Sequence, residues 1–469
     1  RQSMVYTMPE FLERRYNPQS RTILSVISLV SYVLTKVAVT VYAGGLVFQQ
    51  VFGIKELWGI DFFWIAAIGL VVLTALYTIF GGMKSVLYTS VLQTPILLLG
   101  SLIILVLGFK ELGGWDEMMR VCGAVTVNDY GDTMTNLIRS NDDANFPWLG
   151  ALIGSAIIGF WYWCTDQFIV QRVLSGKNEM EARRGTIFGA YLKLLPVFLF
   201  LIPGMIAFAL HQKYIGAGGE GFLPMLANGT ANADAAFPTL VAKLLPAGVK
   251  GLVVCGILAA LMSSLASLFN SSAMLFTIDF YKRFKPETPE KKLVGIGQIA
   301  TIVIVVLGIL WIPIMRSVGV FIYTYLQDVQ SVLAPGIAAA FLLGICWKRT
   351  SAQGGMWGLI SGMVIGLTRL GAKVYYSNAG EVADSTFKYL FYDMNWLFFC
   401  GWMFLFCIIV VIVVSLATEA PTAEKIQGLV FGTATKEQKA ATRASWNHWD
   451  IIHTVIILAI TAAFYWYFW

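Results

Sequence analysis

Charged residues are scarce in this chain of 469 residues. They make up 13% of the sequence, against 57% for hydrophobic residues, whereas a soluble domain carries about 25% charged residues. The shortage excludes an ordinary soluble domain, and the long apolar runs have the length that crosses a bilayer. The composition predicts an all-α polytopic membrane protein. We expect it in a plasma membrane or a bacterial inner membrane.

Histidine and cysteine are also few. The three histidines, His211, His448 and His453, are too scattered to form a metal cluster. Five of the six cysteines lie in or beside apolar segments, so they offer neither a secreted disulfide framework nor a paired metal-ligand spacing. We find no Ser/His/Asp set, phosphate-binding glycine loop or pair of catalytic carboxylates in the sequence. We therefore expect that the protein is not an enzyme.

Negative charge is the rarer sign, and the formal net charge is +6. The basic residues lie in loops between apolar segments, which indicates membrane orientation and not nucleic-acid binding. If Arg14 and Arg15 are cytoplasmic, 20 Lys and Arg residues fall inside, 11 fall outside, and Lys36 and Lys193 fall within apolar segments. This bias predicts eleven crossings with Trp469 outside.

Eleven apolar segments are long enough to serve as these crossings. They are approximately residues 22–51, 62–80, 86–107, 148–170, 186–210, 251–276, 293–315, 322–347, 356–374, 396–416 and 451–469. The long loops expected outside are residues 110–147 and 211–250. The chain begins in a polar stretch without an apolar signal sequence, and we expect a further segment before it.

A line of small and hydroxyl-bearing residues follows one face of the predicted sixth helix. Ala260, Ser263, Ser264, Ser267 and Ser271 fall at i, i+3, i+4, i+7 and i+11. Small residues let transmembrane helices pack closely, which is one interpretation. Hydroxyl and carbonyl oxygens also suit a hard cation such as sodium, which is the other. The stretch alone leaves both open.

The fourth segment places polar residues directly after an aromatic triplet. Tyr162 and Trp163 belong to the triplet, and Thr165, Asp166 and Gln167 follow within a few residues. A continuous lipid-facing helix tolerates such a run poorly, so we expect a helix break or a water-facing cavity. The aromatic side chains fit an interfacial belt or a site where rings stack on a sugar.

Further polar residues lie inside apolar segments. Lys193 is far from the charged end of its segment, where it either serves function or extends its amine to the interface. Pro196 and Pro203 permit bends in the same segment. Gln327 and Asp328 begin the eighth segment, either as a helix cap or as part of a site. Together, these groups can meet around one solute.

Four motifs resemble those of the sodium/solute symporter family, and most closely its sodium/glucose cotransporter branch. They are WYWCTDQFIVQRVLSGKN, YLKLLP, ALMSSLASLFNSS with FTIDFYKR, and YLQDVQSVLAPG with FLLGICWKR. The resemblance implies a LeuT-like transporter core of five plus five helices in an inverted repeat, with extra C-terminal helices. It also implies sodium-coupled symport of a glucose-like or galactose-like hexose by alternating access.

The same resemblance divides the chain. Residues 1–110 correspond to the last three core helices of repeat one, and residues 111–147 to an extracellular loop. Residues 148–350 correspond to repeat two, with most of the sodium and sugar residues present. Residues 351–469 are additional helices with a cytoplasmic loop over 418–448. The first core helices are then missing from this chain, which would carry half a binding site.

The resemblance assigns the sodium ion to three residues. The backbone carbonyl of Ala260 and the hydroxyls of Ser263 and Ser264 are the expected ligands. Ser90 stands where relatives commonly carry Asp, and Ala266 stands where two-sodium members carry Thr. These departures favour one sodium ion per sugar.

The resemblance assigns the sugar to four residues. Tyr162 is the expected inner gate with Trp163 beside it, while Lys193 and Gln327 bind sugar hydroxyls. Gly159 stands where sugar-transporting relatives have Thr or Asn, which removes one hydrogen bond. An inositol, a sialic acid, a carboxylate or proline remains an alternative solute, and a sugar sensor that does not transport remains an alternative function.

Overall fold

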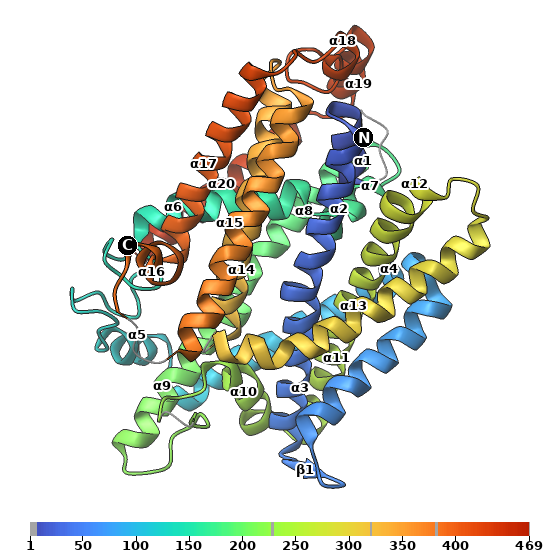
Figure 1. Cartoon of the computed structure of the whole chain (residues 1–469). Helices are drawn as coiled ribbons and strands as arrows, with labels where there is room; N and C mark the ends of the chain where they lie inside the picture. Colours follow the sequence, from blue (N-terminus) through green and yellow to red (C-terminus); the bar gives the residue numbers. More distant parts are fainter. Residues whose placement is uncertain (1–6, 227–228, 319–320, 380–382, 469) are drawn as a thin grey trace. The chain divides into compact units, whose positions relative to one another are not determined.

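The structure is a computed structural model that describes residues 7–226, 229–318, 321–379 and 383–468. The side chains of residues 77, 79–90, 92 and 316–318 are not described. Helices dominate these ranges (Figure 1). The two short strands, β1 (Glu56–Leu57) and β2 (Ile60–Asp61), form an antiparallel hairpin. Its turn residues, Trp58 and Gly59, both have positive φ, as a two-residue hairpin turn requires.

The chain forms two compact units. The first unit comprises Arg1–Val37, Asn141–Ile187 and Ser271–Ile456, and the second comprises Ala38–Ser140, Phe188–Asn270 and Ile457–Trp469. Three helices contain residues of both units: α8 (Glu179–Pro196), α11 (Ala247–Met274) and α20 (His448–Tyr467).

The first unit contains most of the elements. They are α1 (Met8–Arg15), α2 (Pro18–Ser31), π-helical η1 (Tyr32–Val37), α6 (Trp148–Phe160), π-helical η2 (Trp161–Thr165), α7 (Gln167–Leu174), π-helical η5 (Leu275–Tyr281), α12 (Lys282–Phe284), α13 (Glu290–Val318), α14 (Ile322–Cys346), α15 (Ala352–Asn378), α16 (Thr386–Lys388), π-helical η6 (Tyr389–Asp393), α17 (Trp396–Ala417), α18 (Ala423–Ile426) and α19 (Lys436–Ala444).

Helices α14, α15 and α17 pack side by side in the first unit (Figure 1). Glycines permit the close approach of α14 and α15. A Cβ atom on Gly362 would lie 2.6 Å from the Cα atom of Gly336. Two backbones that meet this closely are typical of membrane helix pairs with small residues at the contact.

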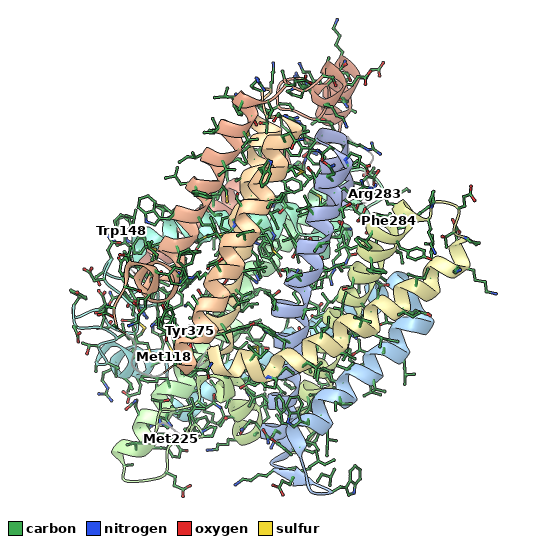
Figure 2. All side chains as sticks on the ribbon, in the orientation of Figure 1. Met118, Trp148, Met225, Arg283, Phe284 and Tyr375 are labelled. Atoms are coloured by element: carbon green, nitrogen blue, oxygen red, sulfur yellow. The ribbon has the colours of Figure 1, made fainter. Side chains whose placement is uncertain are left out.

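The second unit is built around a long helix. Its elements are α3 (Ala38–Phe52), α4 (Phe62–Leu112), α5 (Trp115–Gly123), π-helical η3 (Val197–Leu201), α9 (Ile202–Gly216), the 3₁₀ turn η4 (Ala233–Ala235) and α10 (Ala236–Leu244). Its core gathers side chains of α4, α5, α9, α10 and α11, among them Ile104, Met118, Ile206, Leu240 and Val253. Met118 is labelled in Figure 2.

The second and third predicted segments do not form separate helices. Residues 62–80 and 86–107 both lie in α4, whose 51 residues form one continuous helix. It extends for roughly 75 Å at 1.5 Å per residue, beyond the ~30 Å of a hydrocarbon core. The linking residues 81–85 contain two glycines but no proline, so every residue there keeps its helical N–H donor.

Nine helices of the described residues are long and apolar enough to cross a membrane. Residues Phe62–Leu76 form a shorter apolar stretch, and α15 carries Arg369 and Lys373 in its second half. Large apolar side chains lie exposed on the helices, such as Trp148 of α6 at 45% and Tyr375 of α15 at 63%. Both residues are labelled in Figure 2. Such an apolar exterior is the surface that faces lipid in a membrane protein.

Candidate functional site

The fourth predicted segment is broken at Asp166. Helix α6 ends at Phe160, the π-helical turn η2 follows, and Asp166 has an extended backbone (φ −76°, ψ 120°) before α7 begins. The Asp166 carboxylate accepts a hydrogen bond from the Phe168 N–H at 3.2 Å and so caps α7. The helix break predicted from the polar run is confirmed.

The π-helical turn gives the aromatic triplet three different surroundings. Trp161 is buried in the core of the first unit, Tyr162 is half-buried, and Trp163 is 51% exposed. The Tyr162 and Trp163 rings meet edge to face, with their centroids 5.2 Å apart. The two residues predicted to stack on a sugar therefore lie together, and Trp163 is the more exposed of the two.

Lys36 lies in an aromatic cage beside the helix break. Its ammonium group pairs with the Asp166 carboxylate and lies 4.7 Å from the Tyr32 ring centroid, 4.3 Å from that of Phe168 and 5.6 Å from that of Tyr162. The Tyr32 hydroxyl donates a further hydrogen bond to Asp166 at 3.3 Å. Charge pairing and cation–π contacts together compensate the desolvation of the nearly buried lysine.

Sequence reasoning missed this pair. Lys36 entered only as one of two lysines within apolar segments, and 130 residues separate it from Asp166. The available signal was chemical, because a lysine and an aspartate in apolar segments each need a partner of opposite charge.

The glutamines of α7 already have protein partners. The Gln171 amide donates to the Ser271 hydroxyl at 2.6 Å, and the Gln167 amide oxygen accepts from the Met8 N–H at 2.9 Å. Both glutamines are buried. Ser271, the last member of the polar line, therefore takes part in helix packing, as the first interpretation of that line expects.

Gln327 lies in the second turn of α14, which packs against η2 in the first unit. Its amide nitrogen donates to the Tyr323 hydroxyl at 2.9 Å, whereas its amide oxygen is buried without a hydrogen-bond partner. Since α14 begins at Ile322, Gln327 does not cap the helix. A buried acceptor without a donor costs about 1–3 kcal/mol, which a bound hydroxyl group can recover.

The neighbouring Asp328 joins α14 to α15. Its carboxylate lies 2.7 Å from the Lys373 amine and 3.5 Å from the Arg369 guanidinium. Arg369 is fully buried, donates to the Met394 carbonyl oxygen at 2.7 Å, and lies over the Phe399 ring. These contacts fix the turn of α14 that carries Gln327.

The predicted sodium ligands and Lys193 belong to the second unit. Ala260, Ser263 and Ser264 share one turn of α11, where Ser263 is 8% exposed and Ser264 faces outward. Lys193 is exposed near the end of α8, followed by Pro196 and the π-helical turn η3. The described residues contain no group of three or more His, Cys, Asp or Glu that could hold a metal ion. A cation on this turn would therefore bind hydroxyl and carbonyl oxygens.

Three positions, Gly159, Ala266 and Ser90, differ from the residues that the resemblance leads us to expect. A Cβ atom on Gly159 would meet no atom within 4 Å, and Ala266 is buried. The side chain of Ser90 lies outside the described residues. The ligand roles of Ala260, Ser263, Ser264, Tyr162, Trp163, Lys193 and Gln327 stay predictions.

Known proteins are similar in sequence to this chain over most of its length. A family profile described as the sodium:solute symporter family matches residues 1–362. The sodium/mannose cotransporter SLC5A10 of Bos taurus is 34% identical over 99% of this chain and 81% of its own length. The sodium/myo-inositol cotransporter 2 of Homo sapiens is 35% identical over 92% of this chain and 64% of its own. The sodium/glucose cotransporter 1 of Ovis aries is 36% identical over 88% and 64%.

A solved structure shares the fold. The substrate-bound, outward-open state of a Na⁺-coupled sialic acid symporter superposes with a TM-score of 0.65, at 21% identity, over 89% of this chain and 78% of that one. The present chain spans about two thirds of the length of the inositol and glucose relatives.

Proposed function

Because this chain belongs to the sodium:solute symporter family, we propose that it carries a neutral polyhydroxylated solute, a hexose or an inositol, across the membrane together with sodium. The members of this family are multi-pass sodium-coupled transporters and not enzymes. Sodium is accordingly the coupling ion. The named substrates of the relatives, mannose, myo-inositol and glucose, are all neutral molecules rich in hydroxyl groups.

The observation that carries the choice of solute is the unpaired amide oxygen of Gln327. It lies on α14, which packs against the turn η2 that presents Tyr162 and Trp163. A sugar hydroxyl supplies the missing donor, and an aromatic ring suits the apolar face of a sugar ring. A carboxylate solute would instead place negative charge against an acceptor, so the arrangement favours a neutral polyol.

Sodium coupling is assigned to the turn of α11 that holds Ala260, Ser263 and Ser264. One charge that crosses about 100 mV supplies roughly 2.3 kcal/mol, and a tenfold sodium gradient adds about 1.4 kcal/mol, which together support roughly 500-fold accumulation. One sodium ion per solute is therefore sufficient for uphill uptake. If both ligands favour the same conformation, each tightens the binding of the other.

Uptake into proteoliposomes tests the proposal. The protein is reconstituted, an inward sodium gradient is imposed, and radiolabelled glucose, galactose, mannose, myo-inositol, sialic acid and proline are compared. We expect accumulation of one or more of the neutral polyols, abolished when potassium replaces sodium. Saturable binding of a polyol without accumulation would identify a sensor and overturn the proposal, as would accumulation of sialic acid or proline alone.

A further inference from the structure

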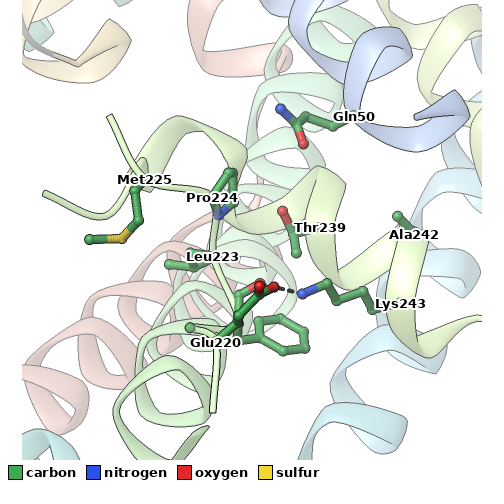
Figure 3. Close-up of a pocket in the computed structure, with 10 residues that line it drawn as sticks. Gln50, Glu220, Leu223, Pro224, Met225, Thr239, Ala242 and Lys243 are labelled. Atoms are coloured by element: carbon green, nitrogen blue, oxygen red, sulfur yellow. Dashed lines mark hydrogen bonds between the residues drawn. The ribbon is translucent and has the colours of Figure 1, made fainter. Parts of the chain in front are cut away.

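The second unit contains a pocket that the predicted sodium and sugar residues do not use. Its lining residues are drawn in Figure 3. Its volume is about 460 Å³, within the range of about 300–1,000 Å³ that is usual for small-molecule sites. We call it the outer pocket, because it is built largely from the 211–250 region expected outside the membrane. Its walls are Gln50 of α3, residues 220–225, and Thr239, Ala242 and Lys243 of α10.

Side chains around it hold the wall of residues 220–225 in place. The Leu223 N–H donates to Nδ1 of His211 at 3.0 Å. The Lys243 amine donates to the Phe222 carbonyl oxygen at 2.7 Å and lies 4.7 Å from the Phe222 ring centroid. Figure 3 marks the hydrogen bond of the Lys243 amine with a dashed line. A Cβ atom on Gly221 would overlap the His211 ring, so glycine is required at that position. The wall is therefore a fixed part of the second unit.

Thr239 supplies the signal that points to a ligand. Its side chain is 4% exposed, and its hydroxyl group is buried without a hydrogen-bond partner. By contrast, two helical threonines of this unit donate to the carbonyl oxygen one turn back, Thr74 to Leu70 at 2.7 Å and Thr461 to Ile457 at 2.9 Å. Figure 3 shows the Thr239 hydroxyl directed between Gln50 and Pro224. Buried hydroxyl groups are almost always hydrogen-bonded, so a bound molecule is the expected partner.

The charges of the lining favour a neutral ligand. Glu220 and Lys243 carry opposite charges, so an anion and a cation would each meet one repulsive group. The Gln50 amide and the Thr239 hydroxyl can both donate and accept hydrogen bonds. Leu223 and Pro224 give an apolar wall for the C–H face of a ring.

We propose that the outer pocket is a second solute site, which binds a neutral polyol from the external side. The chemical class follows from the lining, whereas its identity with the transported solute rests on the proposed function. Residues of the predicted transport site, such as Gln327, take no part in it.

Protection from chemical labelling tests this site. Met225 is 55% exposed and lines the pocket, so Met225→Cys places a thiol there for a membrane-impermeant maleimide. The full-length protein is labelled from outside in sodium-free buffer, and modification of residue 225 is read by mass spectrometry. Glucose, mannose or myo-inositol, at ten times its dissociation constant for the outer pocket, is expected to slow labelling roughly tenfold. Potassium chloride of equal osmolality is expected to leave the labelling rate unchanged.

Thr239→Val is then added to the Met225→Cys protein, which removes the hydroxyl group and nearly keeps the shape of the side chain. We expect this change to abolish protection by polyols and to leave the labelling rate without polyol unchanged. Thr126→Val, at an exposed threonine outside the pocket, is the matched control and keeps protection. Gln50→Leu gives a second test if Thr239→Val does not fold. The site is overturned if none of the three polyols slows labelling. It is also overturned if the polyols protect the Thr239→Val and Gln50→Leu proteins as strongly as the protein that carries Met225→Cys alone.

Separate measurements test sodium-coupled symport and the outer pocket, so one proposal can fail while the other stands. Gln327→Ala is expected to impair uptake and to leave protection at residue 225 intact. Protection without sodium-driven uptake keeps the outer pocket and rejects symport, whereas uptake without protection rejects the outer pocket alone.

Discussion

Lys36 and Asp166 depend on each other because both are nearly buried. Their side chains are 10% and 3% exposed. Lys36→Met leaves the carboxylate without its cation, and we expect a loss of about 3–5 kcal/mol in stability, the cost of breaking a buried pair from one side. The thermal midpoint of the purified protein, followed by fluorescence-detected chromatography, measures this loss.

The double variant Lys36→Met/Asp166→Asn is the control for that prediction. It removes both charges, so it is expected to be more stable than Lys36→Met alone. A Lys36→Met protein as stable as the unmodified protein would show that the ion pair does not support the helix break.

Gln327 is expected to act on the solute and not on sodium. Gln327→Ala removes the unpaired amide oxygen, and the solute concentration for half-maximal uptake rises about fivefold, since one neutral hydrogen bond contributes about 1 kcal/mol. Sodium dependence at saturating solute stays the same. Gln427→Ala, at an exposed residue outside the membrane-length helices, is the matched control, and an unchanged half-maximal concentration in Gln327→Ala would assign Gln327 to structure.

Ser264 separates the two interpretations of the polar line on α11. If its hydroxyl binds sodium, Ser264→Ala raises the sodium concentration for half-maximal uptake roughly tenfold, because hydrogen-bond-like contacts to a charge contribute about 1.5–3 kcal/mol. Ser267→Ala, one turn further and fully buried, is expected to affect stability instead. Normal uptake by the Ser264→Ala protein at limiting sodium would mean that the polar line on α11 serves helix packing and does not bind sodium.

Single residues were predictable from the sequence where their own chemistry conflicts with lipid. Tyr162, Trp163 and Gln327 stood out as polar or aromatic groups in apolar segments, and the structure places all three in the first unit. The need of Lys36 for an acidic partner was predictable, but which residues Lys36 and Gln171 contact was not, because the contacts join residues 130 and 100 positions apart. No local pattern encodes such a distance.

At the level of helices, the glycine contact between α14 and α15 gives a direct test. A Cβ atom on Gly362 would lie 2.6 Å from the Gly336 Cα atom, and backbone atoms cannot rotate away. We expect Gly362→Ala to lower stability by about 1–3 kcal/mol, as overpacking does. The thermal midpoint in detergent measures the change.

Gly371, on the same helix, is the matched control. A Cβ atom there meets no atom within 4 Å, so Gly371→Ala is expected to be neutral or to gain up to about 1 kcal/mol through helix propensity. Equal effects at the two glycines would mean that α14 and α15 do not approach as closely as described.

The sequence predicted the break in the fourth segment but not the continuity of α4. Asp166 follows an apolar run with polar neighbours, which is a local signal. Residues 81–85 contain only weak helix breakers, so the turn expected between residues 80 and 86 rested on hydropathy and not on backbone chemistry.

For the whole molecule, the predicted all-α transporter fold is confirmed by the likeness to the solved symporter and by the helical structure itself. The resemblance to the sodium/solute symporters is confirmed as well. The assignment of residues 1–110 and 148–350 to two repeats stays a prediction. Inverted repeats share backbone geometry more than side chains, so a hydropathy pattern counts crossings without pairing them.

Lys36 and Asp166 together carry no net charge. If they shift as one body within the membrane's electric field, their displacement requires no electrical work, whereas each elementary charge that traverses 100 mV involves about 2.3 kcal/mol. A voltage step applied without sodium would then draw no transient current from this pair, and the voltage sensitivity of the cycle would fall instead on the travelling ion and on cations that lack such a counter-charge.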